Sequence, residues 1–162
     1  MPVKVLGISD ATTITTGYGH SCALHQTGTI SCWGANWAGQ LGNSTGGNNE
    51  DRSLVPVQVQ GITNATAVTT GYGHSCALHQ IGTISCWGNN WTGQLGNSTT
   101  TDSSVPVQVQ DISDTTTITT SNDHSCALHQ DGTISRWGNN ENGQLGNGSD
   151  PRVPNLVVGF GG

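Results

Sequence analysis

HSCALHQTGTISCWGANWAGQLGN, which runs from His20 to Asn43, is the most informative segment of this chain because it recurs. Near-copies of it follow from His74 to Asn97 and from His124 to Asn147. The first two copies, extended to residues 17–45 and 71–99, differ at only three positions. Repetition at about fifty residues is typical of propellers, solenoids and other arrays. Such repeats form binding surfaces more readily than active sites, because catalysis usually needs one cluster of different groups.

The spacing of the copies divides the chain into units. Each unit opens at a proline, and the units cover residues 2–55, 56–105 and 106–153. PNLVVGF, at the start of residues 154–162, matches PVKVLGI and PVQVQGI, so this last stretch begins a fourth unit with one extra strand. Length varies only between the last glycine of one copy and the next proline, which places the variable loops on one side of the array.

The composition narrows the class of protein. Charged residues make up 9% of the chain and hydrophobic residues 32%, while glycine and small polar residues abound. Turn-forming residues between short β-branched runs predict an all-β fold. The net charge is −6, with four Lys and Arg in total. This balance disfavours nucleic acid and anionic membrane surfaces as partners, since both are bound through basic clusters.

One unit can be interpreted strand by strand. Gly28 suits the left-handed position of a three-residue hairpin loop, which places Cys22 opposite Cys32. The two Cα atoms then fall on a non-hydrogen-bonded pair about 4.5 Å apart, which a disulfide can span. The spacing predicts a disulfide here, and the same pairing in the second unit, with reduced thiols or half of a metal site as the alternatives. The third unit has Arg136 at the second position and leaves Cys126 alone.

Two further kinds of strand complete the unit. We expect β-branched strands at 12–16, 67–70 and 116–120, and a half-buried strand that begins at each proline, with Val57 and Val107 facing inward. Four short strands in about fifty residues form one blade of a β-propeller. The prediction is therefore three four-stranded antiparallel blades plus one extra strand, in a ring completed by oligomerisation or by further sequence.

The combination of HSCAL, GTIS and WGNNWTGQLGN resembles the repeat of the regulator of chromosome condensation family, over nearly the whole chain. The resemblance implies a propeller of four-stranded blades. It also implies that the leading histidine and the tryptophan of each unit are structural: His20, Trp33, His74, Trp87, His124 and Trp137. The paired cysteines resemble those of the secreted bacterial members, which favours an extracellular or cell-surface protein, with the cytoplasm as the alternative.

Family membership alone does not decide function, because members include nucleotide exchange factors, a UV-B sensor and secreted β-lactamase inhibitors. We predict a non-enzymatic module that binds a protein or glycan partner, or assembles, through loops on one propeller face. The alternative is a regulator of a small GTPase of the exchange-factor type. No nucleophile elbow, phosphate loop or Ser/His/Asp order is evident in the sequence. The six histidines recur on separate blades, so no metal or cofactor is expected.

Two aromatic residues in each of the first two units fall outside the family pattern. They are the candidate interaction residues Tyr18, Trp37, Tyr72 and Trp91. Tyrosine and tryptophan are favoured as interface anchors because they offer a large contact area with a polar handle. The alternative is that they cover neighbouring blades in a fold that has little apolar bulk.

Three blades cannot close a ring, since propellers need about four to eight. We therefore expect either a piece of a longer propeller or self-association, as a six-bladed dimer or as a filament. The spare strand at residues 154–160 suggests strand exchange between copies as the means.

Overall fold

The computed structural model describes residues 1–146 and 155–157 of the chain. Its strands form three four-stranded antiparallel sheets, each in simple consecutive order. The first sheet contains β1 (Ala11–Thr16), β2 (His20–His25), β3 (Ile30–Ala35) and β4 (Arg52–Gln58). The second contains β5 (Ala65–Thr70), β6 (His74–His79), β7 (Ile84–Gly88) and β8 (Ser103–Gln108). The third contains β9 (Thr115–Thr120), β10 (His124–His129), β11 (Ile134–Gly138) and β12 (Asn155–Val157).

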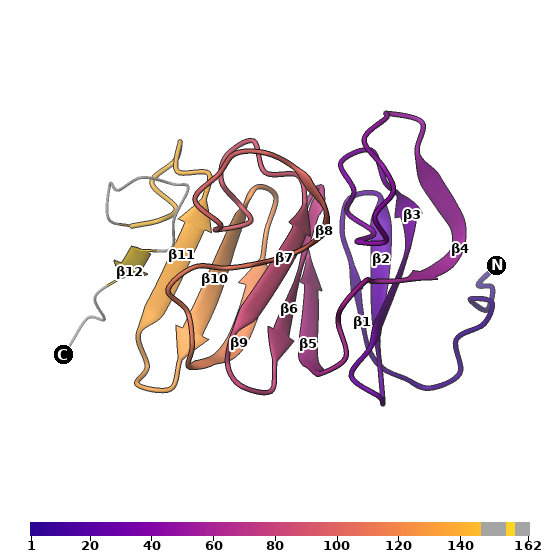
Figure 1. Ribbon diagram of the computed structural model, residues 1–162, viewed down its shortest axis with the longest axis horizontal. Helices are drawn as coiled ribbons and strands as arrows, with labels where there is room; N and C mark the ends of the chain where they lie inside the picture. The colour runs from indigo at the N-terminus through magenta and orange to yellow at the C-terminus, as the bar shows by residue number, and fades with distance from the viewer. Residues whose placement is uncertain (147–154, 158–162) are drawn as a thin grey trace.

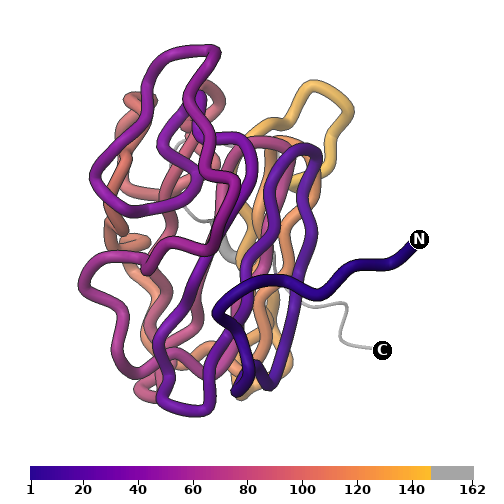
Figure 2. Tube along the Cα trace, turned by 90° about the vertical axis from the view of Figure 1, so that its right-hand side faces the viewer, coloured from indigo at the N-terminus to yellow at the C-terminus, as the bar shows by residue number. Residues whose placement is uncertain are grey.

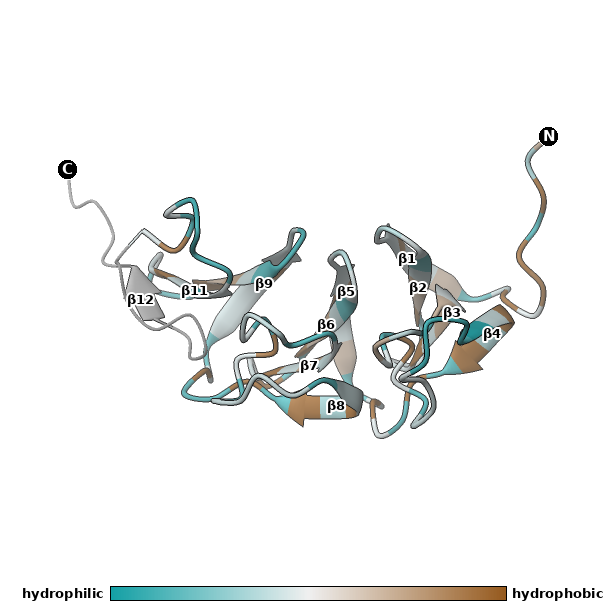
Figure 3. Cartoon of the chain, turned by 90° about the horizontal axis from the view of Figure 1, so that it is seen from above, coloured by the Kyte–Doolittle hydropathy of each residue, from teal (hydrophilic) through white to brown (hydrophobic). Residues whose placement is uncertain are grey.

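The sheets stand side by side as the blades of an open, unclosed propeller (Figure 1). Seen from above, β1, β5 and β9 lie along one side of the arc and β8 on the other (Figure 3). The N-terminal segment before β1 runs outward from the sheets (Figure 2). The all-β propeller architecture predicted from the repeats is therefore confirmed.

The central hairpin of each blade has the predicted register. Leu24 pairs with Ile30 and Cys22 with Cys32, while the His25 amide donates to the Thr29 carbonyl. Gly28 has a φ of +78°, the left-handed conformation that this hairpin loop requires.

Disulfides join Cys22 to Cys32 and Cys76 to Cys86, each with Cα atoms 4.1 Å apart. Cys126 is free. The structure thus has the cysteine pairing that the hairpin register predicts for the first two units.

The strand at each proline belongs to a different sheet from the one that we predicted. Val57 pairs with Cys32, and Val107 pairs with Cys86, so this strand closes the sheet before it instead of opening the next. The sheets thus run from 11 to 58, from 65 to 108 and from 115 to 157. They are offset from the sequence units that begin at residues 2, 56 and 106.

We expected a strand to begin at each proline, but Pro56 lies inside β4. It is tolerated because β4 is an outermost strand, paired on one side only, and Pro56 lies at an irregularity in that pairing.

The predicted spare strand also belongs to the sheet that precedes it. Residues 155–157 pair with β11 of their own chain, and the rest of 154–160 lies outside the described residues. In this structure the segment therefore completes the third sheet of its own chain.

The core lies between the sheets. One cluster joins the first disulfide, Leu24 and Ile30 to Trp87 of the second sheet, and the next joins the second disulfide, Leu78 and Ile84 to Trp137 of the third. Each disulfide therefore belongs to the same cluster as the tryptophan of the following blade. The hydrophobic surface of one blade is buried only when another blade stands beside it.

Candidate functional site

The variable loops and the aromatic candidates share one end of the blades. The loops that follow β3 and β7 rise together at the upper end in Figure 1. The turn between β1 and β2 adjoins the first of these loops, because the Ala35 amide donates to the Gly19 carbonyl. The second unit repeats the bond between Asn89 and Gly73. We call this end of the molecule the loop face.

The four aromatic candidates gather on the loop face. The Tyr18 and Tyr72 rings stack with centroids 4.5 Å apart, and the Trp37 ring lies 5.9 Å from Tyr72 in a tilted arrangement. Trp91 is 74% exposed. The structure thus brings together side chains from two different units of the repeat.

A cleft of about 580 Å³ opens between these rings, and we call it the aromatic cleft. Its lining joins the first unit, the second unit and the turn before β10: Trp37, Asn49, Tyr72, Asn89, Trp91, Thr92, Asn122 and Asp123. Tyr18 lies outside this lining and borders a smaller hollow on the other side of Tyr72.

An asparagine that recurs in each repeat holds the loop that carries each tryptophan through its side-chain hydrogen bonds. The Asn36 side-chain oxygen accepts from the Leu41 amide at 3.0 Å, and Asn36 Nδ2 donates to the Thr45 carbonyl at 3.0 Å. Asn90 forms the equivalent bonds with Leu95 and Thr99. Each tryptophan therefore lies on a loop whose backbone is held by hydrogen bonds within the loop.

The difference between the two tryptophans arises at one repeat position. Trp37 packs so closely on Gly73 that a Cβ there would collide with the indole. In the next unit the residue aligned with Gly73 is Asp123, which has a side chain where Gly73 has none. Trp91 therefore stays largely exposed, and the cleft opens between it and Trp37. The sequence analysis did not identify this position. The change from GYGH at 71–74 to SNDH at 121–124 is the signal that could have pointed to it.

The cleft has an acidic wall. Burial raises the pKa of the Asp123 carboxyl above its usual range, and Glu141 adds to this effect while His124 opposes it. None of the residues that line the cleft is a lysine or an arginine. The cleft therefore offers π faces, amide groups and one poorly hydrated carboxylate.

Four of the repeated histidines and tryptophans lie between the blades and not on the loop face: His20, His74, Trp87 and Trp137. His20 Nε2 is 2.9 Å from the Ser75 hydroxyl, which donates to the Gln40 carbonyl at 3.0 Å. Trp87 Nε1 donates to the same carbonyl at 2.9 Å. Since the Ser75 proton is used on Gln40, His20 Nε2 must be the donor to Ser75.

Burial keeps these histidines neutral. It lowers the pKa of His20 to about 4 and that of His74 to about 3, with the neighbouring histidines adding to the effect at His74. A neutral ring with its proton on Nε2 fits the bond to the serine. These contacts give the repeated His and Trp a place between blades.

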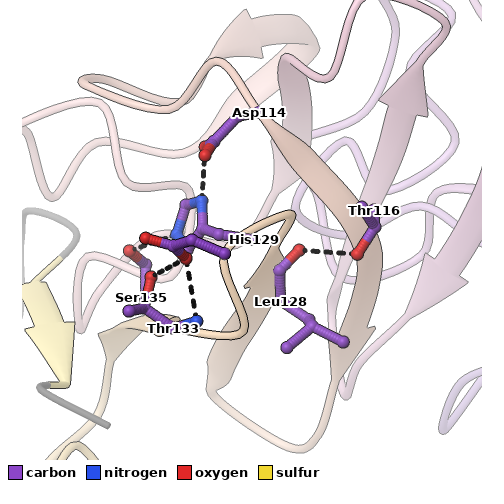
Figure 4. Close-up of polar contacts among 7 residues, drawn as sticks. Asp114, Thr116, Leu128, His129, Thr133 and Ser135 are labelled. Carbon is purple, nitrogen blue, oxygen red and sulfur yellow. Dashed lines mark hydrogen bonds and ion pairs between the residues drawn. The ribbon is translucent and has the colours of Figure 1, made fainter.

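A second histidine in each unit lies in a chain of hydrogen bonds that sequence reasoning missed. Asp114 lies 2.6 Å from His129 Nδ1, and His129 Nε2 lies 2.8 Å from the Ser135 hydroxyl (Figure 4). The first unit repeats this arrangement with Asp10, His25 and Ser31. The order Asp, His, Ser matches that of hydrolase triads only in its connectivity.

Two observations assign these chains a structural part. The second unit has Asn64 in place of the aspartate, yet its distances to His79 and from His79 to Ser85 are 2.7 and 2.9 Å. His129 and Ser135 are both buried. Each of these hydrogen-bond chains joins the residue before the first strand of its sheet to the central hairpin. A catalytic serine would need access to substrate, whereas Ser135 is buried.

Two further features bear on the site. Among the described residues, no group of three or more His, Cys, Asp or Glu side chains is arranged to hold a metal ion. In the same ranges, no helix is long and apolar enough to cross a membrane.

Fold and inter-blade contacts together define a β-propeller repeat protein. The profile of the regulator of chromosome condensation (RCC1) repeat matches residues 27–78 and 82–128, and a second profile of this repeat matches 11–40, 65–94 and 116–144. The chain belongs to the RCC1 repeat family.

Curated relatives share part of the chain. The human probable E3 ubiquitin-protein ligase HERC4 is 35% identical over 98 residues, which cover 59% of this chain and 9% of HERC4. The ultraviolet-B receptor UVR8 of Arabidopsis thaliana is 31% identical over 98 residues, which cover 59% of this chain and 22% of the receptor. The chain therefore corresponds to a small part of each of these proteins.

Solved structures show the same fold. Prp20p from Saccharomyces cerevisiae superposes with a TM-score of 0.84 at 22% identity, over 95% of this chain and 40% of Prp20p. Human WBSCR16 superposes with a TM-score of 0.83 at 24% identity, over 93% of this chain and 40% of that protein.

Proposed function

We propose that this chain is a non-enzymatic binding module that takes a protein partner in the aromatic cleft. One observation carries the proposal: Trp37, Tyr72 and Trp91 converge from two units around a cleft of about 580 Å³, with Tyr18 stacked behind Tyr72. Exposed aromatic residues on fixed loops lose little entropy on binding and supply much of the contact energy at interfaces.

The charge of the cleft favours a basic partner segment. Asp123 stands among π faces, no basic side chain lines the cleft, and the whole chain carries a net charge of −6. A lysine or arginine side chain gains both from the carboxylate and from the faces of Trp37 and Trp91. A glycan would use the same rings with the amides of Asn49 and Asn122, so it is the second ligand class to test.

The similar proteins give limited support for a protein partner. One solved structure contains Kap60 bound to yeast RCC1 (Prp20). A second, of Prp20p, is described together with its binding properties to Gsp1p and histones. At 22% identity these likenesses concern the fold alone, so the partner of this chain is inferred from its own cleft. Regulation of a small GTPase remains the alternative, and a nucleotide-release assay with and without the chain tests it.

The two disulfides favour an oxidising compartment. Cys22–Cys32 and Cys76–Cys86 would be kept reduced in most cytosols. We therefore place the module outside the cell or at the cell surface, with the cytoplasm as the alternative.

A peptide display library and a glycan array, probed in parallel with the purified chain, test the proposal. We expect enriched peptides to contain lysine or arginine. Trp91→Ala should weaken the best of them by about tenfold or more, since Trp91 is an anchor that is not needed for packing. Asp123→Asn should weaken them most at low salt.

Ile81→Ala is the matched control, because Ile81 is also exposed but lies in the hairpin loop at the opposite end of the blades. It should leave binding unchanged. Peptide binding that Trp91→Ala does not weaken would refute the cleft. Glycan binding without peptide binding would refute the protein partner while leaving the cleft in place.

A further inference from the structure

We propose that the aromatic cleft takes the trimethylated ammonium of a methylated lysine on the protein partner, in preference to an unmodified lysine or arginine. This preference rests on the proposed function, because it names the side chain that the cleft would take. The cleft combines rings and a carboxylate that attract a cation with buried acceptors that are already used. A cation that brings no N–H donors fits this combination best.

Three aromatic rings supply the faces that attract a cation. The Trp37 and Tyr72 rings meet at 58° with their centroids 5.9 Å apart, so they form a corner and not a flat stack. Trp91 is the third ring of the lining and is largely exposed. A cation that lies over the face of an aromatic ring is attracted by the ring quadrupole, and tryptophan is the strongest partner.

The Asp123 carboxylate has no counter-charge of its own beside it. Its Oδ1 accepts one long hydrogen bond, of 3.5 Å, from Gln94 Nε2. Among the described residues it forms no ion pair. Burial raises the pKa of this carboxyl, because the surroundings solvate its charge less well than water does. A ligand cation would supply the missing counter-charge.

The other buried acceptors of the cleft wall are already engaged. Asn89 Oδ1 accepts from Gln94 Nε2 at 2.6 Å and from the Trp91 amide at 3.3 Å. The Asp123 carbonyl accepts from the Asn139 amide at 2.8 Å. The cleft wall therefore offers a cation one carboxylate and several rings, but no set of acceptors for several N–H groups.

The number of N–H donors distinguishes the basic side chains. A lysine ammonium carries three donors and an arginine guanidinium carries five. A donor that enters the cleft without an acceptor loses its bond to water and is not compensated. Trimethylation keeps the charge of the lysine and removes its donors. The trimethylated side chain therefore keeps the attraction to the rings and to Asp123 and avoids this cost.

The size of the cleft favours a cation that is carried by a protein segment. Its volume of about 580 Å³ lies within the range of sites that hold drug-sized ligands, so a trimethylammonium group alone leaves much of it unfilled. Asn49 and Asn122 are exposed members of the lining, and their amides can donate to and accept from a peptide backbone. Choline carries the same cation without a peptide, so it is the competing ligand in the test.

Peptide pairs that differ only in methylation test the preference. A synthetic library of short peptides with a central lysine is made in two forms, with that lysine unmethylated or trimethylated, and both forms are probed with the purified chain. For the tightest pair, calorimetric titration should give a Kd about tenfold or more lower for the trimethylated peptide. A third peptide, in which carbon replaces the ammonium nitrogen, has the same shape without the charge and should lose most of this gain.

Two substitutions of Trp91 separate its π face from its apolar bulk. Trp91→Phe retains a ring and should keep part of the methylation gain, whereas Trp91→Leu should lose most of it. Asp123→Asn should weaken the trimethylated peptide more than the neutral one, because it removes the charge and keeps the shape. Ile81→Ala, at the opposite end of the blades, should leave both Kd values unchanged. Circular dichroism shows that each variant is folded.

The outcomes distinguish this preference from the proposed function. Equal Kd values for the unmethylated and trimethylated peptides would overturn the preference and leave the protein partner of the cleft in place. No binding of either form would refute the protein partner, and the preference with it. Choline that binds as tightly as the trimethylated peptide would overturn a cation carried by a protein. A methylation gain that Trp91→Leu leaves unchanged would contradict recognition by the rings.

Discussion

A single repeat position determines whether a loop-face tryptophan is seated or exposed. Gly73 accepts the ring of Trp37, whereas Asp123 leaves Trp91 without a seat. This position also places the carboxylate in the cleft wall. The features on which the proposed binding rests therefore arise from a departure from the repeat and not from the repeat itself.

Gly73→Ala should displace Trp37, because the new Cβ would overlap the indole. We expect a shift of the tryptophan emission and weaker binding of any ligand of the aromatic cleft. Gly19→Ala is the control at the same position of the first unit, where the nearest atom is the Ala35 Cβ at 3.2 Å. Equal fluorescence changes in the two variants would contradict the seat assigned to Trp37.

Ser75→Ala should destabilise the chain by about 1–3 kcal/mol, because it leaves the buried His20 Nε2–H without an acceptor. Ser21→Ala is the matched control. Its hydroxyl has no hydrogen-bond partner among the described residues, so the substitution should change stability by less than about 0.5 kcal/mol. Urea unfolding measures both. An equal loss in the two variants would contradict the inter-blade network.

Buried neutral histidines predict that stability falls in acid. His74 has a pKa of about 3 in the folded chain, against about 6.5 when unfolded, so the unfolded chain binds more protons between these values. The free energy of unfolding is therefore fully retained above about pH 6.5 and declines as the pH falls through this window, by about 1.4 kcal/mol per pH unit for each such histidine.

His74→Gln should reduce that slope, and urea unfolding at several pH values between 7 and 4.5 measures it. The raised pKa of Asp102 and Asp123 acts in the opposite direction, but both carboxyls are present in the two proteins, so their contribution cancels in the comparison. The same slope with and without His74 would show that its burial does not control the acid response.

At the scale of the strand, local rules predict what local geometry controls. The glycine in the hairpin loop sets the register, and the register brings Cys22 to Cys32, so both were predictable from thirteen residues. The sheet to which β4 belongs was not predictable in this way, because the long loop before β4 determines which strand it pairs with. The same PVQV pattern fits the edge of either neighbouring sheet.

The disulfides should stabilise the chain. Opening both by reduction, or replacing Cys76 and Cys86 with alanine, should lower the free energy of unfolding by up to about 3 kcal/mol for each bond. Cys126→Ala is the control, since Cys126 is already free. Non-reducing mass spectrometry should find the two bonds, with only Cys126 alkylated after unfolding. Five free thiols in protein from its native compartment would contradict the bonds and the extracellular location.

At the scale of the whole molecule, the repeat predicts the row of blades but not the cleft. Tyr18, Trp37, Tyr72 and Trp91 were identifiable as departures from the family pattern. Their convergence depends on how far one blade turns from the next, which no local rule supplies. The Asp–His–Ser chains were missed for a similar reason, because the aspartate comes from a loop before the sheet that contains the histidine and serine.

The indole N–H signals of the five tryptophans offer the most direct test of binding in the aromatic cleft. Trp87 and Trp137 are fully buried between blades, and Trp33 lies on the outer face of the first sheet, so only Trp37 and Trp91 border the cleft. The best peptide from the display library is titrated into ¹⁵N-labelled chain while ¹H–¹⁵N spectra are recorded. We predict saturable shifts of the Trp37 and Trp91 signals with the Trp87 and Trp137 signals unmoved. Binding that shifts Trp33 alone, or leaves Trp37 and Trp91 unmoved, would contradict the account.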